Sequence, residues 1–492
     1  MSRSATLGGR LPAAVLVLLL ALALVADGSV QWGTDPEDLA AGGLGAGSVA
    51  AEGNDTGSGS AGPGTTAAEA AGAEVDRLAD AAVEDLLAYW AETFEPAFAL
   101  PWVPPTGGLH AADGIADVGR KAPPCLARTT EIAGSAYYCE SADALVWDRG
   151  VLLPVLAEDH GPAGVTVVLA HELGHRVHTR LGVDDAARRT MPERYPVLLS
   201  EAMADCYAGT YFRWAVDGGG ASGFTTAEVD DALAALVRFR DPIVVGEPPE
   251  RTHGGALDRV LAFHEGYSQG ARRCAALTTQ DLAPPPPRQD RPLRNRPLAE
   301  LSTEDLGTYF ADLAIRHGGH GPAPVVRTVA GDPDCGTGQG PVAFCPAEPA
   351  VVIGIGADGD LAEVNSRIGD HAAATMVAGR HALAATTRLG LPIDDPTAGR
   401  RAVCLVGAWS AAGPAQADRT EAAADDGQGR RSAHVEEQWW GVGDLDEAVL
   451  LLLADDQPAR DVTGFAGDGS GLQRVLDFAA GRRDGAADCL RR

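Results

Sequence analysis

Short segments of the first half of this chain recur, in the same order, in its second half. TRLG stands at 179–182 and again at 387–390, and RVLAF at 259–263 is matched by RVLDF at 474–478. Each half also carries four cysteines, in this order: Cys125, Cys139, Cys206 and Cys274, then Cys335, Cys345, Cys404 and Cys489. Single matches arise by chance in a chain rich in Ala, Leu and Gly, but several matches in register with paired cysteines do not. The sequence therefore predicts one structural unit present twice.

Composition predicts the segments that flank these units. An apolar run at 11–26 follows two arginines, as in a signal peptide or an N-terminal membrane anchor. The Gly/Ala/Ser-rich stretch after it is too poor in apolar residues to fold, and a Pro-rich stretch at 284–297 separates the units. We expect a signal peptide or anchor at 1–28, a disordered linker at 29–75, the first unit at 76–281, a Pro-rich linker at 282–299 and the second unit at 300–492.

The first unit contains HELGH at 171–175, inside an apolar run with helical spacing. Two histidines four residues apart lie on one face of a helix, so His171 and His175 can bind one zinc ion together. Glu172 then points at the open side of the metal, where it can take a proton from zinc-bound water. This arrangement predicts metal-assisted hydrolysis.

The next predicted helix, at 196–209, supplies a third zinc ligand. Glu201 and Asp205 lie one turn apart on one face of that helix. We expect Glu201 to bind the metal, and Asp205 to accept a hydrogen bond from the ring of a ligand histidine and so fix its tautomer. Two solvated acids on a helix are common, but this pair placed one helix after HELGH is rarer.

At these motifs the chain resembles the bacterial neutral zinc metallopeptidase family. The resemblance rests on HELGH at 171–175, EAMADCYAG at 201–209, YYCESADALVWD at 137–148 and THGGALDRVLAFHEGY at 252–267, and it covers about residues 80 to 280. One position departs from the pattern, because His178 stands where the family usually has Gln.

The resemblance implies a zincin-like α+β fold that is mainly helical, one Zn²⁺ per chain, and peptidase activity on a peptide or protein substrate. It also implies the disulfides Cys125–Cys139 and Cys206–Cys274, with Cys335–Cys345 and Cys404–Cys489 as their counterparts. A structural zinc site is the other use of Cys and His, but the close C-x2-C pairs that such sites usually need are absent.

The second unit lacks the predicted metal ligands. With the TRLG segments aligned, His171, Glu172 and His175 fall on Gly379, Arg380 and Leu383. With the cysteine motifs aligned, Glu201 and Asp205 fall on Gly399 and Val403. His381 lies nearby but has no partner set. We therefore expect the second unit to be a non-catalytic repeat that binds no zinc.

Helices dominate the predicted fold. We expect them at 76–92, 226–239 and 255–270 in addition to the two metal helices, with an extended segment at 144–147 and its counterpart at 351–355. In zincin-like sites such a strand borders the cleft, where a peptide can pair with its edge.

A second stabiliser of the oxyanion is needed beside the metal. His253, in the sequence THGG, is the first candidate, although it could equally be a turn residue, and Tyr207 is a weaker one. His110, His160 and His178 are interpreted as exposed polar residues.

Charge and cysteine content limit the environment and the partners. The formal charge of −29 excludes nucleic-acid binding through a general electrostatic surface. Eight cysteines agree with an exported chain, because disulfides persist outside the cytoplasm. We expect an extracytoplasmic protein, secreted or anchored through its N-terminal segment, with no other membrane contact.

Two other classes of function are compatible with these features. A cell-surface binding or scaffold protein could keep a vestigial zinc site, and the inert second unit favours it. A zinc hydrolase could also act on a bond other than a peptide bond. A cleavage assay on unfolded proteins, with and without chelator, separates a peptidase from a scaffold.

Overall fold

The computed structural model is mainly helical, with two small sheets, which confirms the expected α+β class. It describes residues 67–241, 253–282, 297–298, 303–335, 338–423, 443–467 and 469–492. The expected signal peptide or anchor and most of the Pro-rich linker lie outside these residues. Among the described helices, none is long and apolar enough to cross a membrane.

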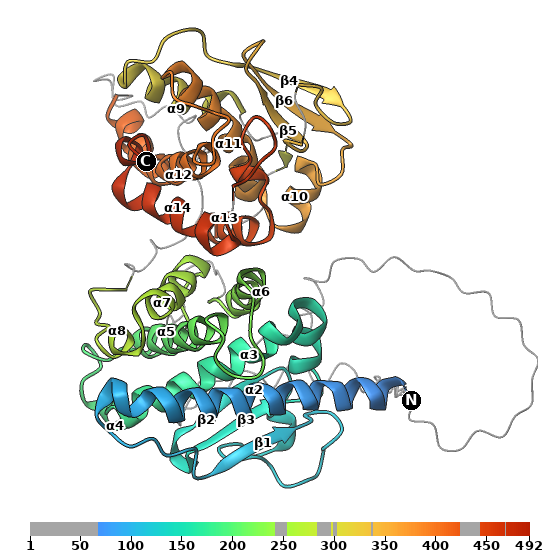
Figure 1. Cartoon of the computed structure of the whole chain (residues 1–492), viewed down its shortest axis with the longest axis vertical. Coiled ribbons are helices and arrows are strands. Elements are labelled where there is room, and N and C mark those ends of the chain that lie inside the picture. Colours follow the sequence, from blue (N-terminus) through green and yellow to red (C-terminus); the bar gives the residue numbers. More distant parts are fainter. Residues whose placement is uncertain are drawn as a thin grey trace, which may run out of the picture.

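The first half begins with one long helix, followed by a sheet and the helices that carry the predicted metal ligands (Figure 1). In chain order its main elements are α2 (Ala67–Phe98), β1 (Gly108–Ala112), β2 (Ala136–Cys139), β3 (Ala144–Asp148), α3 (Leu152–Arg180), α4 (Asp185–Thr190), α5 (Val197–Val216), α6 (Thr226–Val237), α7 (Ala256–Gln269) and α8 (Ala271–Ala275).

The second half runs through a similar series of elements. They are α9 (Thr303–Arg316), β4 (Val325–Ala330), β5 (Val342–Cys345), β6 (Ala350–Ile355), α10 (Leu361–Arg367), α11 (Asp370–Arg388), α12 (Ala398–Ala423), α13 (Asp444–Ala454), α14 (Gly471–Asp484) and α15 (Ala486–Cys489). The two sheets share one topology. Their orders are β1-β3-β2 and β4-β6-β5, and in each the central strand has one parallel and one antiparallel neighbour.

Two expectations on element positions need correction. Helix α2 begins at Ala67, inside the linker expected at 29–75, because the Ala-rich sequence before Asp76 favours a helix and Val75 is already buried in the core. The strand at 144–148, expected to border the cleft, is the centre of its sheet and is paired on both sides. Its neighbours β1 and β2 are the edge strands instead.

Glycines allow the main helices of each half to cross at backbone contact. A Cβ on Gly209 of α5 would lie 2.0 Å from the carbonyl oxygen of Phe263 on α7, and one on Gly266 would lie 1.8 Å from that of Cys206. In the second half, Gly407 and Gly481 make the same approaches between α12 and α14. No other residue fits at such distances, so these glycines set the spacing of both helix pairs.

The structure contains four disulfides, and they are the four pairs expected: Cys125–Cys139, Cys206–Cys274, Cys335–Cys345 and Cys404–Cys489. No cysteine is free. Such a set is typical of proteins in oxidising compartments, outside the cytoplasm.

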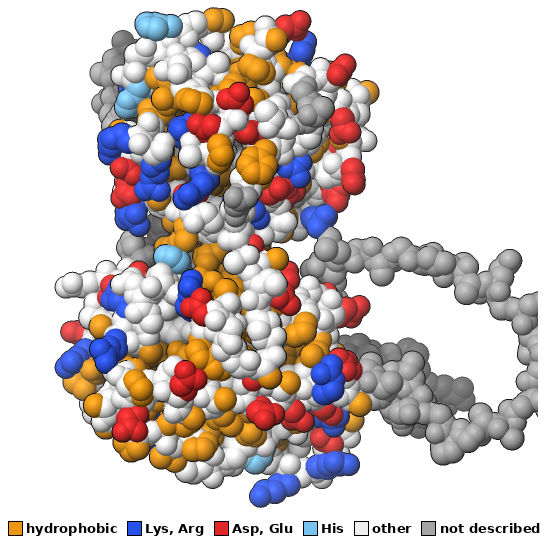
Figure 2. All heavy atoms as spheres, in the orientation of Figure 1, with side chains coloured by type: hydrophobic (Ala, Val, Ile, Leu, Met, Phe, Trp, Pro, Cys, Tyr) orange, Lys and Arg blue, Asp and Glu red, His pale blue; other side chains and the backbone are white. Residues whose placement is uncertain are grey.

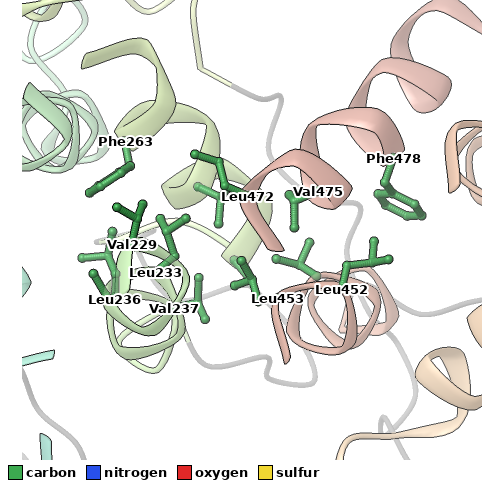
Figure 3. Close-up of a cluster of buried hydrophobic side chains, with 14 of the residues drawn as sticks. Val229, Leu233, Leu236, Val237, Phe263, Leu452, Leu453, Leu472, Val475 and Phe478 are labelled. Carbon is green, nitrogen blue, oxygen red and sulfur yellow. The ribbon is translucent and has the colours of Figure 1, made fainter. Parts of the chain in front are cut away.

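The two halves pack through two helices each. In Figure 1, α6 and α7 of the first half face α13 and α14 of the second. The buried apolar side chains of this contact are shown in Figure 3: Val229, Leu233, Leu236, Val237 and Phe263 from the first half, and Leu452, Leu453, Leu472, Val475 and Phe478 from the second. They belong to one continuous hydrophobic cluster that spans both halves, so burial of apolar surface holds the halves together.

The remaining surface is mixed in charge. Figure 2 shows acidic and basic side chains interspersed over both halves on the face in view.

Candidate metal centre

Helix α3 presents His171 and His175 on one buried face. Gly161 interrupts this helix with a φ of 60°, and the part that follows carries HELGH without a further break. The two imidazole rings meet edge to face with centroids 4.6 Å apart. Helix spacing alone therefore brings the two ring nitrogens near a common point.

Helix α5 places Glu201 opposite these histidines. One carboxylate oxygen lies 3.2 Å from Nε2 of His171 and the other lies 3.5 Å from Nε2 of His175. Both oxygens are completely buried, and neither accepts a hydrogen bond within the described part of the chain. Two ligands bound to zinc at about 2.0–2.1 Å in tetrahedral geometry lie about 3.3 Å apart. The three side chains therefore fit a zinc ion.

The approach of α5 to α3 depends on Gly174, the fourth residue of HELGH. A Cβ at this position would lie 2.8 Å from the carbonyl oxygen of Ala204 and 2.9 Å from its Cα. Ala204 stands between Glu201 and Asp205, so the glycine lets the helices meet where the carboxylates must reach the histidines.

We expect Gly174→Ala to push these two helices apart. Overpacking of this kind costs about 1–3 kcal/mol of stability, and it also moves Glu201 away from the histidines. Thermal unfolding and a zinc titration measure the two effects. Gly72→Ala in α2 is the control, because its Cβ would meet nothing within 4 Å. Wild-type zinc affinity in Gly174→Ala would contradict this role of the helix contact.

Asp205 forms a hydrogen bond with His171 on the side of the ring away from Glu201. Its Oδ1 lies 2.6 Å from Nδ1 of His171, and both of its oxygens accept hydrogen bonds from the guanidinium of Arg259 on α7, at 2.7 and 2.9 Å. Arg259 also donates to the carbonyl oxygen of Phe239 and is fully buried. Because Nδ1 of His171 donates to the carboxylate, its Nε2 keeps a lone pair for a metal.

His178 gives the same support to His175, which corrects its interpretation as an exposed residue. It is 1 % exposed. Its Nδ1 donates to the carbonyl oxygen of Val183, so its Nε2 accepts a hydrogen bond from Nδ1 of His175 at 3.0 Å. The lone pair of His175 Nε2 therefore faces Glu201. His110 and His160, interpreted in the same way, are half-buried.

Buried charges determine how these groups hold protons. Burial lowers the pKa of His171, but Asp205 and Glu201 raise it more, to about 9. For His178, burial and then the positive charge of Arg188 lower the pKa to about 3. The carboxylates therefore favour positive charge at the His171 end of the site, as a cation-binding site requires.

Glu172 lies beside the edge strand rather than in the ligand set. Its Oε2 accepts a hydrogen bond from the backbone N–H of Tyr138, at 2.8 Å. The ligand atoms of His171, Glu172 and His175 also lie within 4.8 Å of one another. Glu201 remains the candidate third ligand because its two oxygens lie 3.2 and 3.5 Å from the two Nε2 atoms, while Glu172 is held by β2.

A small cavity, of about 90 Å³, opens beside this cluster. Its lining combines the edge strand, both metal helices and α4: Tyr138, Glu140, Glu172, His175, His178, Thr179, Arg188, Val197, Ser200 and Glu201. Arg188 forms an ion pair with Glu140 at 3.2 Å on the wall of the cavity. The cavity has room for water, and the catalytic candidate Glu172 faces it.

The two oxyanion candidates have different positions. Nε2 of His253 lies 4.0 Å from a carboxylate oxygen of Glu201, so this side chain reaches the site. Tyr207 does not line the cavity and packs against Trp90 and Phe98 in an aromatic cluster. Tyr207 was a wrong candidate because its place on α5 turns it toward α2, away from Glu201.

The positions aligned with the metal site are filled in the second half. A Cβ on Gly379 would lie 2.9 Å from the carbonyl oxygen of Pro458, and one on Gly399 would lie 1.6 Å from that of Ala459. Arg380, which is fully buried, donates to the carbonyl oxygens of Arg460, at 2.8 Å, and Gln457. A short backbone segment therefore occupies the space that side chains occupy in the first half. His381 is buried and stacks on Phe310.

Comparison with known proteins places the first half in a family. The model of the family described as "putative neutral zinc metallopeptidase" matches residues 6–277. This match covers more than half of the chain, so the chain belongs to that family. Family membership implies a zinc cofactor, in agreement with the ligand set on α3 and α5.

Three curated relatives are similar over a shorter stretch. They are uncharacterized proteins from Mycobacterium bovis and from two strains of Mycobacterium tuberculosis, each 28% identical over 164 residues. These residues cover 30% of this chain and 56% of each relative, so the chain spans about half the length of the curated relatives it matches. No solved structure matches.

Proposed function

We propose that this chain hydrolyses peptide bonds with zinc bound by His171, His175 and Glu201. One observation carries the proposal. Both Glu201 oxygens are buried, accept no hydrogen bond from the described residues, and lie 3.2 and 3.5 Å from the Nε2 atoms of the two histidines. A buried carboxylate in that position is costly unless a cation joins it, so a metal ion accounts for the arrangement.

Each side chain of the site then has a distinct task. Zinc held by this set would supply Lewis-acid chemistry, lowering the pKa of a water molecule. Glu172 takes the proton of the attacking water and passes it to the amine that leaves. His253 donates a hydrogen bond to the carbonyl oxygen as negative charge develops there. Asp205 and His178 hold the two ligand rings in the required tautomers.

The edge strand β2 is the proposed binding place for the substrate backbone. It lies on the outside of the sheet, and Tyr138 both lines the cavity and holds Glu172. An extended peptide can add to such an edge through main-chain hydrogen bonds, which would bring its scissile bond to the cavity. The four disulfides support an extracytoplasmic site of action.

We propose further that residues 300–492 are a repeat of the first unit that binds no zinc. The same sheet topology, the same glycine contacts and equivalent disulfides support the relationship. Glycine stands at two of the three aligned ligand positions, with backbone packed against it, and Leu383 stands at the third, so the ligand set is lost and no room is left for a metal. The expected stoichiometry is one zinc per chain.

One cluster of acids in the second half is not a rival zinc site. Asp370, Asp444 and Glu447 place carboxylate oxygens within 4.8 Å of one another. Glu447 accepts a hydrogen bond from the backbone N–H of His371 in the first turn of α11, where a carboxylate stabilises a helix N-terminus. Zinc sites in proteins favour nitrogen and sulfur ligands over three carboxylates.

A cell-surface scaffold with a vestigial metal site is the second candidate. The second half favours this candidate, because backbone fills the space that corresponds to the metal site and the chain keeps that half although it lacks the metal ligands. An apolar interface explains the retention equally well.

Metal removal distinguishes the two candidates. We expect the purified chain to contain one zinc and to cleave an unfolded protein, to lose this activity in a chelator, and to recover it when zinc is returned. Metal analysis and peptide release are the measurements. A metal-loaded chain that cleaves none of a set of unfolded proteins would leave the scaffold function as the better account.

A further inference from the structure

The two halves exchange helix caps across their interface. Asp446 of α13 accepts a hydrogen bond from the backbone N–H of Ala256, at the start of α7 in the first half, at 2.8 Å. In return, Asp230 of α6 accepts hydrogen bonds from Gly471 and Leu472, at the start of α14 in the second half, at 2.5 and 2.8 Å. The two aspartates stand at equivalent places in the two units, so the exchange is reciprocal, as in a two-fold dimer.

Only one of these caps reaches the metal centre. Oδ2 of Asp446 lies 3.1 Å from Nε of Arg240, while Oδ1 binds Ala256, so one buried carboxylate joins the segment before His253 to the segment after it. The neighbouring Asp241 accepts hydrogen bonds from the backbone N–H groups of His253 and Gly254, both at 2.8 Å.

The start of α7 and the residues just before it position two groups of the site, His253 and Arg259. His253 lies three residues before Ala256, the first residue of α7, and its Nε2 is 4.0 Å from Glu201. Arg259, one turn into α7, holds Asp205 and through it His171. A shift at the start of α7 would therefore move His253 first, while Arg259 remains tied by its paired hydrogen bonds.

We propose that the second half completes the active site of the first, with Asp446 as a positioning residue that holds His253 beside Glu201. This inference rests on the proposed function for its catalytic consequence, but its structural part can be tested without activity. A unit with no metal chemistry of its own is then retained because the neighbouring site needs it.

The test compares Asp446→Ala with Asp230→Ala in the full-length chain. Each variant removes one inter-half helix cap, and of the two aspartates Asp446 is the one that contacts the segment that carries His253. By hydrogen–deuterium exchange we expect Asp446→Ala to raise uptake in the peptide spanning 253–260 and Asp230→Ala to raise it at 471–476. Unchanged uptake at 253–260 in Asp446→Ala would overturn the inference, whether or not the chain is a peptidase.

Kinetics test the consequence. We expect Asp446→Ala to lower kcat about tenfold with zinc content and KM unchanged, since a small displacement of a catalytic group has effects of this size. Asp230→Ala should retain wild-type kcat.

In a His253→Ala background, Asp446→Ala should lower kcat no further, because its effect passes through the His253 side chain. Additive losses, or equal losses in both aspartate variants, would show a merely structural role. A wild-type chain without zinc-dependent cleavage would contradict the proposed function, and the exchange result would still decide the positioning.

Discussion

Replacement of Glu172 by Gln is expected to abolish hydrolysis while zinc stays bound. In the proposed mechanism Glu172 supplies proton transfer and is held by the N–H of Tyr138, whereas His171, His175 and Glu201 are the proposed ligand set. The amide keeps the size of the side chain and an oxygen for the Tyr138 hydrogen bond, but it cannot accept the proton of the attacking water. Loss of a general base costs about 10²–10⁴-fold in turnover. Peptide release and metal content are measured on the same sample.

Two variants of the same helix complete this experiment. Glu158→Gln changes an exposed glutamate on α3 and should keep wild-type turnover. His175→Ala removes a ligand, so it should lose zinc as well as activity. If Glu172→Gln kept near-normal turnover, another group would have to be the base. If it lost zinc, Glu172 would belong to the ligand set and the assignment of Glu201 would be wrong.

The central part of this site can be predicted from the helical spacing of its residues in the sequence. His171, Glu172 and His175 lie within one helix, where the four-residue spacing alone fixes their common face. Glu201 and Asp205 were found because their own one-turn spacing lies on the following helix, and the crossing at Gly174 brings the two faces together. Such features depend on helix geometry, which a sequence displays directly.

The supporting groups depend on tertiary contacts, which periodicity does not display. His178 is buried because the chain turns back at Val183 and offers it a carbonyl oxygen. Arg259 reaches Asp205 from a helix 54 residues further along the chain. One signal was present: the sequence RVLAF recurs as RVLDF in the second half, so an arginine shared by both units marked this position.

Periodicity also could not predict the order of the strands, or the backbone that fills the space next to Gly379 and Gly399 in the second half. The segment at 144–148 reads as a strand, but only its pairing partners decide that β2, and not β3, has the free edge. Alignment predicted the loss of ligands at Gly379 and Gly399. It could not predict that the backbone at 457–459 would fill the space, since that contact joins separate parts of the fold.

Removal of the Asp205 carboxylate is expected to damage both the fold and the metal site, through different partners. In Asp205→Ala, Arg259 keeps its charge in a fully buried place and its hydrogen bond to the carbonyl oxygen of Phe239, but it loses the carboxylate that balances that charge. Breaking one side of a buried ion pair costs about 3–5 kcal/mol. His171 meanwhile loses the acceptor that fixes its tautomer, and loss of such a partner costs about 10–100-fold in metal affinity. Chemical unfolding and a zinc titration measure the two losses.

The double variant Asp205→Ala/Arg259→Met separates these two effects. Methionine fills part of the space of the arginine without its charge, so the free energy of unfolding should recover most of the loss. Zinc affinity should stay low, because His171 still lacks its acceptor. Arg259→Met alone should weaken stability and leave Asp205 bound to His171. If the double variant regained zinc affinity, the carboxylate would act on the metal site only by holding the fold. If it regained neither property, Arg259 would have to stabilise α7 by contacts beyond its pair with Asp205.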